Sequence, residues 1–172
     1  AVLFNQQIRK RILWQEDEIN IGDRLMVVKN NYYWLREYDE ISDELIANGD
    51  IVEVVRILDR FDRYGYEFAE VDVVLVDLEN SPHLSLTIMT TILNDNKPSL
   101  SMAENKELFK KIADDYIDLG SKSKIQTAVI RDQCYQALQV KYAYSLTCHK
   151  AQGGQWPAII LDQGFITEEM MD

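Results

Sequence analysis

Residues 51–93 read IVEVVRILDRFDRYGYEFAEVDVVLVDLENSPHLSLTIMTTIL and contain three runs rich in β-branched and apolar residues, at 51–58, 67–77 and 84–93. Such runs are typical of β-strands, and the Y-G-Y sequence predicts a turn between the first two. A shorter apolar run at 25–28 predicts a fourth strand upstream. Four strands at short spacing, with little helix between them, predict a small antiparallel barrel.

The segments at the two ends of the chain predict further elements. Residues 3–14 place Phe4, Ile8 and Ile12 four positions apart, with polar residues between them. This spacing predicts an amphipathic helix whose apolar face packs against the rest of the molecule. Near the other end, residues 137–146 predict an additional strand.

The longest predicted helix spans residues 101–119 (SMAENKELFKKIADDYIDL). Ser101 followed by Glu104 is a capping-box sequence, and Gly120 is a typical C-terminal stop. The apolar stripe of this helix consists of Leu108, Ile112, Tyr116 and Leu119. Residues 121–133 are predicted to be a polar connection.

The composition fits a globular protein of the cytoplasm. Of the 172 residues, 47% are hydrophobic, which is ample for a core. No apolar run approaches the roughly 20 residues that a membrane-spanning helix needs. The two cysteines, Cys134 and Cys148, lack C-x-x-C spacing, so we expect neither a zinc site nor a disulfide framework. Since the sequence starts with Ala1 instead of Met, we expect a piece of a longer protein.

The net charge of −11 argues against a broad nucleic-acid-binding surface, because phosphate contacts require Lys and Arg. Any contact with nucleic acid must therefore be local, or be completed by a more basic part of the parent chain.

The densest group of polar residues follows the last predicted strand, in the segment TCHKAQGGQ at 147–155. Thr147 is placed to cap a short helix whose free amides can face an anion, and His149 and Lys150 add hydrogen-bond donors. The Gly pair lets the backbone approach a ligand, and Gln155 can bond to a sugar hydroxyl or a phosphate. These groups suit a nucleotide or a nucleic acid. The alternative is a purely structural turn, in which Thr147 is only a cap and the Gly pair only ends the turn.

Residues 142–156 (YAYSLTCHKAQGGQW) resemble motif V of superfamily 1 helicases, and their T-x-H-K-x-Q-G pattern is most similar to the RecD/Dda/Pif1-like branch. Three other segments carry the same resemblance. Residues 4–9 (FNQQIR) are similar to the N-x-x-(I/L)-R segment that follows motif IV. Residues 22–30 (GDRLMVVKN) and 47–50 (ANGD) are similar to the strand and turn that open a small barrel inserted in the second motor domain of these enzymes.

The resemblance implies a mixed α/β fold: part of a RecA-like domain, of the P-loop NTPase type, with an inserted SH3-like antiparallel β-barrel. Residues 1–20 and 137–172 would form the discontinuous part of the second RecA-like motor domain. Residues 21–136 would form the inserted small β-barrel domain, with the long helix near 101–119.

The resemblance also implies roles for individual residues. Thr147, His149 and Lys150 would bind single-stranded DNA. The residues expected to couple DNA contact to the nucleotide site are Gln152, Gly153, Gly154, Gln155 and Arg9. Relatives often carry Glu where this chain has Gln155, and Gln lacks the charge that a metal role would use. We therefore expect no metal ligand in this chain.

By the same resemblance, the parent is an ATP-dependent DNA helicase, similar to the exodeoxyribonuclease V alpha subunit, that acts in DNA repair or recombination. It would use ATP and Mg²⁺ and move 5′ to 3′ along single-stranded DNA. The other partners expected are the remaining motor domain of the parent chain and proteins bound through the barrel, with no membrane contact.

The sequence contains no G-x-x-x-x-G-K-(S/T), so nothing in it cradles the β- and γ-phosphates of ATP. Because phosphoryl transfer needs all parts of the site together, we expect the chain alone to be inactive. Two other interpretations stay open. The first is a non-catalytic protein-interaction module. The second is a nuclease, although no Asp/Glu/Lys cluster with metal-site spacing is visible.

Overall fold

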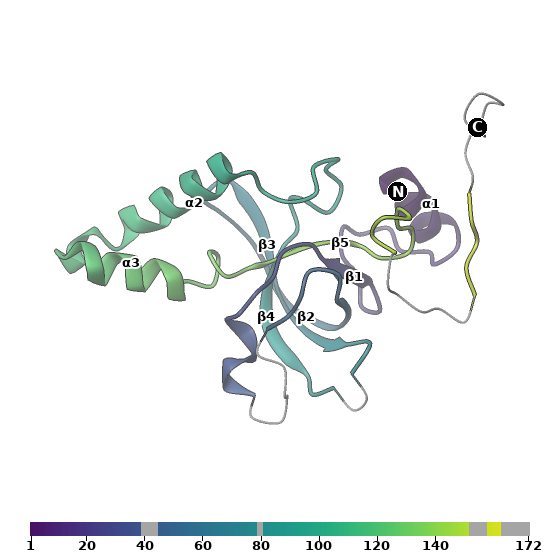
Figure 1. Ribbon diagram of the computed structural model, residues 1–172, viewed down its shortest axis with the longest axis horizontal. Helices are drawn as coiled ribbons and strands as arrows, with labels where there is room; N and C mark the ends of the chain where they lie inside the picture. The colour runs from purple at the N-terminus through teal and green to yellow at the C-terminus, as the bar shows by residue number, and fades with distance from the viewer. Residues whose placement is uncertain (39–44, 79–80, 152–157, 163–172) are drawn as a thin grey trace.

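The computed structural model describes residues 1–38, 45–78, 81–151 and 158–162 (Figure 1). The elements follow the chain in the order α1 (Val2–Arg11), β1 (Arg24–Val27), η1 (Trp34–Glu37), β2 (Ile51–Arg63), β3 (Tyr66–Leu75), β4 (Leu84–Met89), α2 (Met102–Asp115), η2 (Ile117–Leu119), α3 (Lys122–Arg131) and β5 (Leu138–Tyr142), where η marks a short 3₁₀ helix. The strands occupy the middle of the molecule, with α2 and α3 packed side by side at one end and α1 at the other (Figure 1).

The five strands form a closed barrel in the order β1-β2-β3-β4-β5. Four of the five pairings are antiparallel, with β1 joined to both β2 and β5. The fifth, between β4 and β5, is a short parallel pairing from Ile88↔Leu138 to Met89↔Gln139. Parallel neighbours need a long crossover connection, and α2 and α3 supply it here. The mixed α/β class and the small barrel are thus confirmed. The prediction that the barrel is antiparallel throughout is wrong at β4 and β5, and a RecA-like domain stays a prediction.

The last strand, β5, belongs to the barrel. It pairs with β1 from Leu25↔Tyr142 to Val27↔Val140 and so closes the sheet. Residues 137–172 are predicted to belong to the RecA-like part, and β5 at the start of this range pairs with barrel strands. The division into domains stays a prediction.

The hairpin β2–β3 is the longest feature of the barrel. Tyr64 has a φ of 58° and Gly65 a φ of 82°, and two successive positive φ values are typical of a tight hairpin turn. This confirms the turn predicted from the Y-G-Y sequence. Register shifts between Val54 and Arg56 and between Ile57 and Asp59 mark irregularities at which β2 can bend around the barrel.

The capping box predicted at the start of α2 is present. The Ser101 hydroxyl accepts a hydrogen bond from the Glu104 amide, and the Glu104 carboxylate accepts one from the Ser101 amide. The helix ends earlier than predicted, at Asp115, and the chain continues as η2 up to Gly120, which has a φ of 67°.

The prediction of a polar connection at 121–133 is wrong, because most of this range forms α3. Ile125, Ala128 and Val129 recur at helical spacing, and Val129 is fully buried beside α2. The apolar signal is only one turn long and lies among Lys, Ser and Gln residues, a composition that favours a loop. Tertiary packing against α2 stabilises a helix that propensity alone would leave marginal.

Two clusters of buried apolar side chains hold the fold together. The first fills the barrel and includes Leu25, Val71, Ile88 and Val140. The second lies between the barrel wall and the α2–α3 pair and includes Phe68, Leu108, Ile112 and Val129. The first cluster therefore stabilises the interior of the barrel, and the second holds the α2–α3 pair against the barrel wall.

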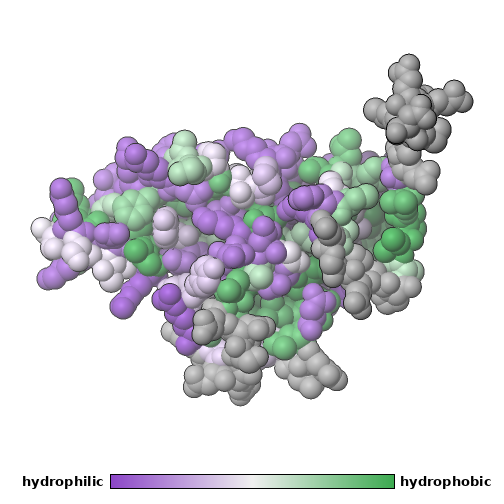
Figure 2. Space-filling model, in the orientation of Figure 1, coloured by the Kyte–Doolittle hydropathy of each residue, from purple (hydrophilic) through white to green (hydrophobic). Residues whose placement is uncertain are grey.

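Helix α1 packs with a face adjacent to the one predicted, and Ile8 of the predicted apolar stripe is only partly buried. Its buried residues are Asn5 and Arg9, whereas Phe4 is 53% and Ile12 66% exposed. Leu3 and Trp14 are also exposed nearby, as are residues 159–161. Figure 2 shows hydrophobic surface gathered at the end of the molecule that carries α1.

Candidate nucleic-acid interface

The polar segment predicted to bind DNA leaves the barrel directly from the end of β5. Within it, the Thr147 carbonyl accepts hydrogen bonds from the Lys150 amide at 2.9 Å and the Ala151 amide at 3.0 Å. These bonds close a single turn over residues 148–151, where a short helix is predicted. Thr147, His149 and Lys150 are all exposed, so the three predicted DNA-binding residues lie together on one accessible turn.

The chain just before this segment is held by Asn5 of α1. The Asn5 carboxamide donates to the Ser145 carbonyl at 3.0 Å and accepts from the Ser145 amide at 2.7 Å. Asn5 itself is only 4% exposed. A side chain that satisfies both backbone groups of one residue acts as a neighbouring strand would, and it fixes both the position and the orientation of that peptide.

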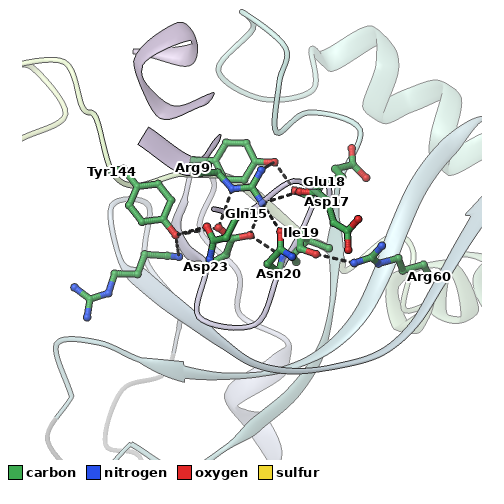
Figure 3. Close-up of polar contacts among 11 residues, drawn as sticks. Arg9, Gln15, Asp17, Glu18, Ile19, Asn20, Asp23, Arg60 and Tyr144 are labelled. Atoms are coloured by element: carbon green, nitrogen blue, oxygen red, sulfur yellow. Dashed lines mark hydrogen bonds and ion pairs between the residues drawn. The ribbon is translucent and has the colours of Figure 1, made fainter. Parts of the chain in front are cut away.

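One helical turn further along α1, Arg9 enters a buried polar network (Figure 3). Its guanidinium binds Asp23 with two bonds, from Nε to Oδ1 at 2.9 Å and from Nη2 to Oδ2 at 2.8 Å. Nη2 also donates to the Asp17 carbonyl and to the Asn20 side chain, while Nη1 donates to the Tyr142 hydroxyl at 3.1 Å. The guanidinium carbon lies 4.3 Å from the centre of the Tyr142 ring.

The network continues from Asp23 to the polar segment. Tyr144 donates its hydroxyl to Asp23 Oδ1 at 2.9 Å and accepts a hydrogen bond from the Arg24 amide at 3.1 Å (Figure 3). Burial raises the pKa of both Tyr142 and Tyr144 to about 12. Both hydroxyls therefore stay protonated at neutral pH, and each can donate as well as accept. Tyr142 uses its proton to bond to the Glu18 carbonyl.

A cavity of about 160 Å³ lies where α1, the 93–98 segment and the polar segment meet. Thr147 and Lys150 both line it. Its other lining residues include Asn5, Lys97, Lys141 and Leu146. Burial lowers the pKa of Lys150, which means that its ammonium group is partly removed from water. A partly desolvated cation at an exposed turn favours an anionic partner.

The other two lysines of this cavity have partners within the chain. Lys141 donates to the carbonyls of Ile92 and Asp95, the latter at 2.7 Å, and so holds the 92–95 turn against β5. Lys97 pairs with Glu104 at 2.9 Å. Lys150 is therefore the lysine of this group that stands on the predicted DNA-binding turn itself.

The remaining predicted site residues are the five expected to couple DNA contact to the nucleotide site. Gln152, Gly153, Gly154 and Gln155 lie outside the described residues. Arg9 is 5% exposed, and its guanidinium faces the barrel through the bonds given above. Its predicted coupling to a nucleotide stays a prediction.

Sequence reasoning missed most of the supporting residues. Asp23 and Tyr144 carried no signal of their own, because a buried polar network joins residues that are distant in sequence. Asn5 and Arg9 did carry one: they are four residues apart, which puts them on the same face of α1. Reading the apolar residues as the buried face hid that signal.

Two negative findings apply to the described residues. They contain no group of three or more His, Cys, Asp or Glu side chains placed to hold a metal ion. None of their helices has the length and apolarity required for a membrane span.

Comparison with known proteins gives one finding about the polar segment. The family model of the UvrD-like helicase C-terminal domain matches residues 142–172. No curated protein matches the chain. The match begins at the end of β5 and includes Thr147, His149 and Lys150, and it supports membership of a superfamily 1 helicase family. The described turn thus lies within the helicase-like part of the sequence.

Proposed function

We propose that this chain is part of the second motor domain, with its barrel insert, of a superfamily 1 DNA helicase of the RecD/Dda/Pif1-like branch. The parent couples ATP hydrolysis, with Mg²⁺, to 5′ to 3′ movement along single-stranded DNA. The observation that carries this proposal is the helicase family match on a segment whose described turn is exposed and rigidly supported. The chain by itself lacks the phosphate-binding loop and does not hydrolyse ATP.

The exposed turn offers the groups that a DNA backbone requires. Thr147 supplies a hydroxyl, His149 supplies ring nitrogens, and Lys150 supplies a positive charge within the same turn. Phosphate and sugar contacts of this kind hold a strand in register without reading its sequence. A motor that moves along DNA needs such sequence-independent contacts.

The net negative charge of the chain limits how strongly this contact can bind DNA. With a net charge of −11, the chain as a whole repels phosphate, so binding has to come from a few groups close to the strand. We therefore expect weak salt dependence from this domain, since only Lys150 of the proposed contacts carries a full positive charge.

The test is DNA-stimulated ATP hydrolysis by the full-length parent. Thr147→Ala and His149→Ala are expected to reduce the stimulation by single-stranded DNA by at least fivefold. Thr127→Ala, on the exposed face of α3, and His83→Ala, on an exposed loop, are the matched controls and should leave stimulation unchanged. Unchanged stimulation in both turn variants would refute the proposed role of the turn.

The second candidate function is a non-catalytic protein-interaction module. The strong net negative charge and the exposed apolar face of α1 favour it, because both suit a protein partner better than DNA. A parent that hydrolyses no ATP, with or without single-stranded DNA, would support this module and would exclude the helicase.

A further inference from the structure

We propose that Asn5 is a positioning residue for the DNA-binding turn, and that α1 and the barrel together hold this turn in its binding conformation before DNA arrives. This inference rests on the proposed function, because it assigns Asn5 a task only if Thr147, His149 and Lys150 bind DNA. It concerns a residue that does not itself touch the strand.

The first support is the geometry at Ser145. Asn5 satisfies both the amide and the carbonyl of Ser145, with bonds of 2.7 Å and 3.0 Å. Ser145 is two residues before Thr147, whose carbonyl closes the exposed turn. Fixing this peptide therefore fixes the direction in which the turn leaves the barrel.

The second support is that α1 is itself anchored to the barrel. Arg9 follows Asn5 by one helical turn, and its two bonds to Asp23 join α1 to the residue just before β1. Asp23 also accepts the hydroxyl of Tyr144, the residue that precedes Ser145. The chain that leads into the polar segment is thus held at two consecutive residues, Tyr144 by Asp23 and Ser145 by Asn5.

This arrangement explains why the inward face of α1 is polar. An apolar face would stabilise the contact, but it would leave the backbone groups of Ser145 without their partner and the segment free to move. A loop that is already ordered loses less conformational entropy when it binds, and so binds more tightly. Loss of the Asn5 contact should therefore weaken DNA binding without removing a DNA contact.

The test measures how the ATPase activity of the full-length parent depends on the concentration of single-stranded DNA. Asn5→Ala is expected to raise the half-saturating DNA concentration about fivefold, or about 1 kcal/mol, with less than a twofold change in the rate at saturating DNA. Gln7→Ala, an exposed substitution on the same helix, is the matched control and should change neither. A half-saturating concentration within twofold of the wild-type value would overturn the inference.

A double-mutant cycle separates positioning from a merely structural role. If Asn5 acts through the turn, Asn5→Ala should weaken binding less in a Thr147→Ala background than in the wild type. Equal fold-changes in the two backgrounds would refute action through Thr147. If Thr147→Ala and His149→Ala both leave DNA stimulation unchanged, the proposed role of the turn fails. If these variants have their effect and Asn5→Ala does not, only the positioning role fails.

Hydrogen exchange of the same parent protein provides a readout that does not depend on activity. In Asn5→Ala, the Ser145 amide loses its acceptor and should exchange at least tenfold faster, while the β5 amides and the Ala143 amide, which bonds to the Arg24 carbonyl, stay protected. Loss of protection in β5 as well would show unfolding, and Asn5→Asp then decides the question. Asp keeps an acceptor for the Ser145 amide, but its second carboxylate oxygen faces the Ser145 carbonyl oxygen and repels it, so the exchange of the Ser145 amide should again rise. Unchanged exchange there would overturn the inference.

Discussion

The buried pair of Arg9 and Asp23 leads to the sharpest stability prediction. Both side chains are withdrawn from water, with exposed fractions of 7% and 0%. The Asp23 carboxylate accepts four hydrogen bonds, two from Arg9 and one each from the Asn20 amide and the Tyr144 hydroxyl. We predict that Asp23→Asn, which keeps the size of the side chain, strongly destabilises the chain.

The magnitude follows from what the Asn amide would face. In one orientation its NH₂ points at Arg9 Nε, and in the other at Arg9 Nη2 and the Asn20 amide, so a donor always meets a donor. The guanidinium also loses its counter-charge while it stays buried. Breaking a buried ion pair by removing one partner costs about 3–5 kcal/mol. Arg9 keeps some neutral acceptors, so we expect a loss near the lower end, about 3 kcal/mol.

The neighbouring residue on β1 offers a matched control. Arg24 pairs with Glu53 at 3.1 Å, but their side chains are 55% and 36% exposed. Glu53→Gln should therefore cost less than about 1 kcal/mol. The assay is urea unfolding of the chain, with equal slopes required so that the midpoints report stability. If Asp23→Asn and Glu53→Gln differ by less than about 1 kcal/mol, the reasoning about burial is refuted.

Two further predictions concern the helical crossover. Hydrogen bonds from Ser101, followed by the contact with Lys97, lower the pKa of Glu104 from 4.5 to about 2. This carboxylate therefore stabilises the fold above its unfolded pKa, and that contribution is lost as the pH falls from 4.5 to 2. Urea unfolding should show that Glu104→Gln flattens the pH dependence in this window; an unchanged slope there would contradict the capping box. Val129→Ala should lower stability by about 2 kcal/mol, because it leaves a void beside α2. The exposed Ile130→Ala should lose less than half as much, and equal losses would show that α3 does not pack as described.

The barrel was predictable because its strands carry local signals. Most apolar runs became strands, and the turns at Gly49 and Gly65 lie at positions where a positive φ favours glycine. Closure was not predictable, since it depends on β5 pairing in parallel with β4 across the whole helical crossover. No periodicity within a single segment encodes that contact.

The site was predictable in part for the same reason. Thr147, His149 and Lys150 are consecutive or nearly so, and a local motif brings them to one exposed turn. Their support was not predictable, because Asn5 is 140 residues from Ser145 in sequence. Hydrogen bonds between distant segments leave no periodic pattern along the chain.

In helix α1, the sequence pattern and the structure indicate different buried faces. Its apolar residues Phe4 and Ile12 predict one buried face, yet the structure buries the face that carries Asn5 and Arg9. Arg9 burial is tolerable because every nitrogen of its guanidinium has an acceptor. The exposed apolar face is then available to the rest of the parent, which the proposed function requires. An α1 that packs on both faces would link the remaining motor domain to the DNA-binding turn through a single rigid helix.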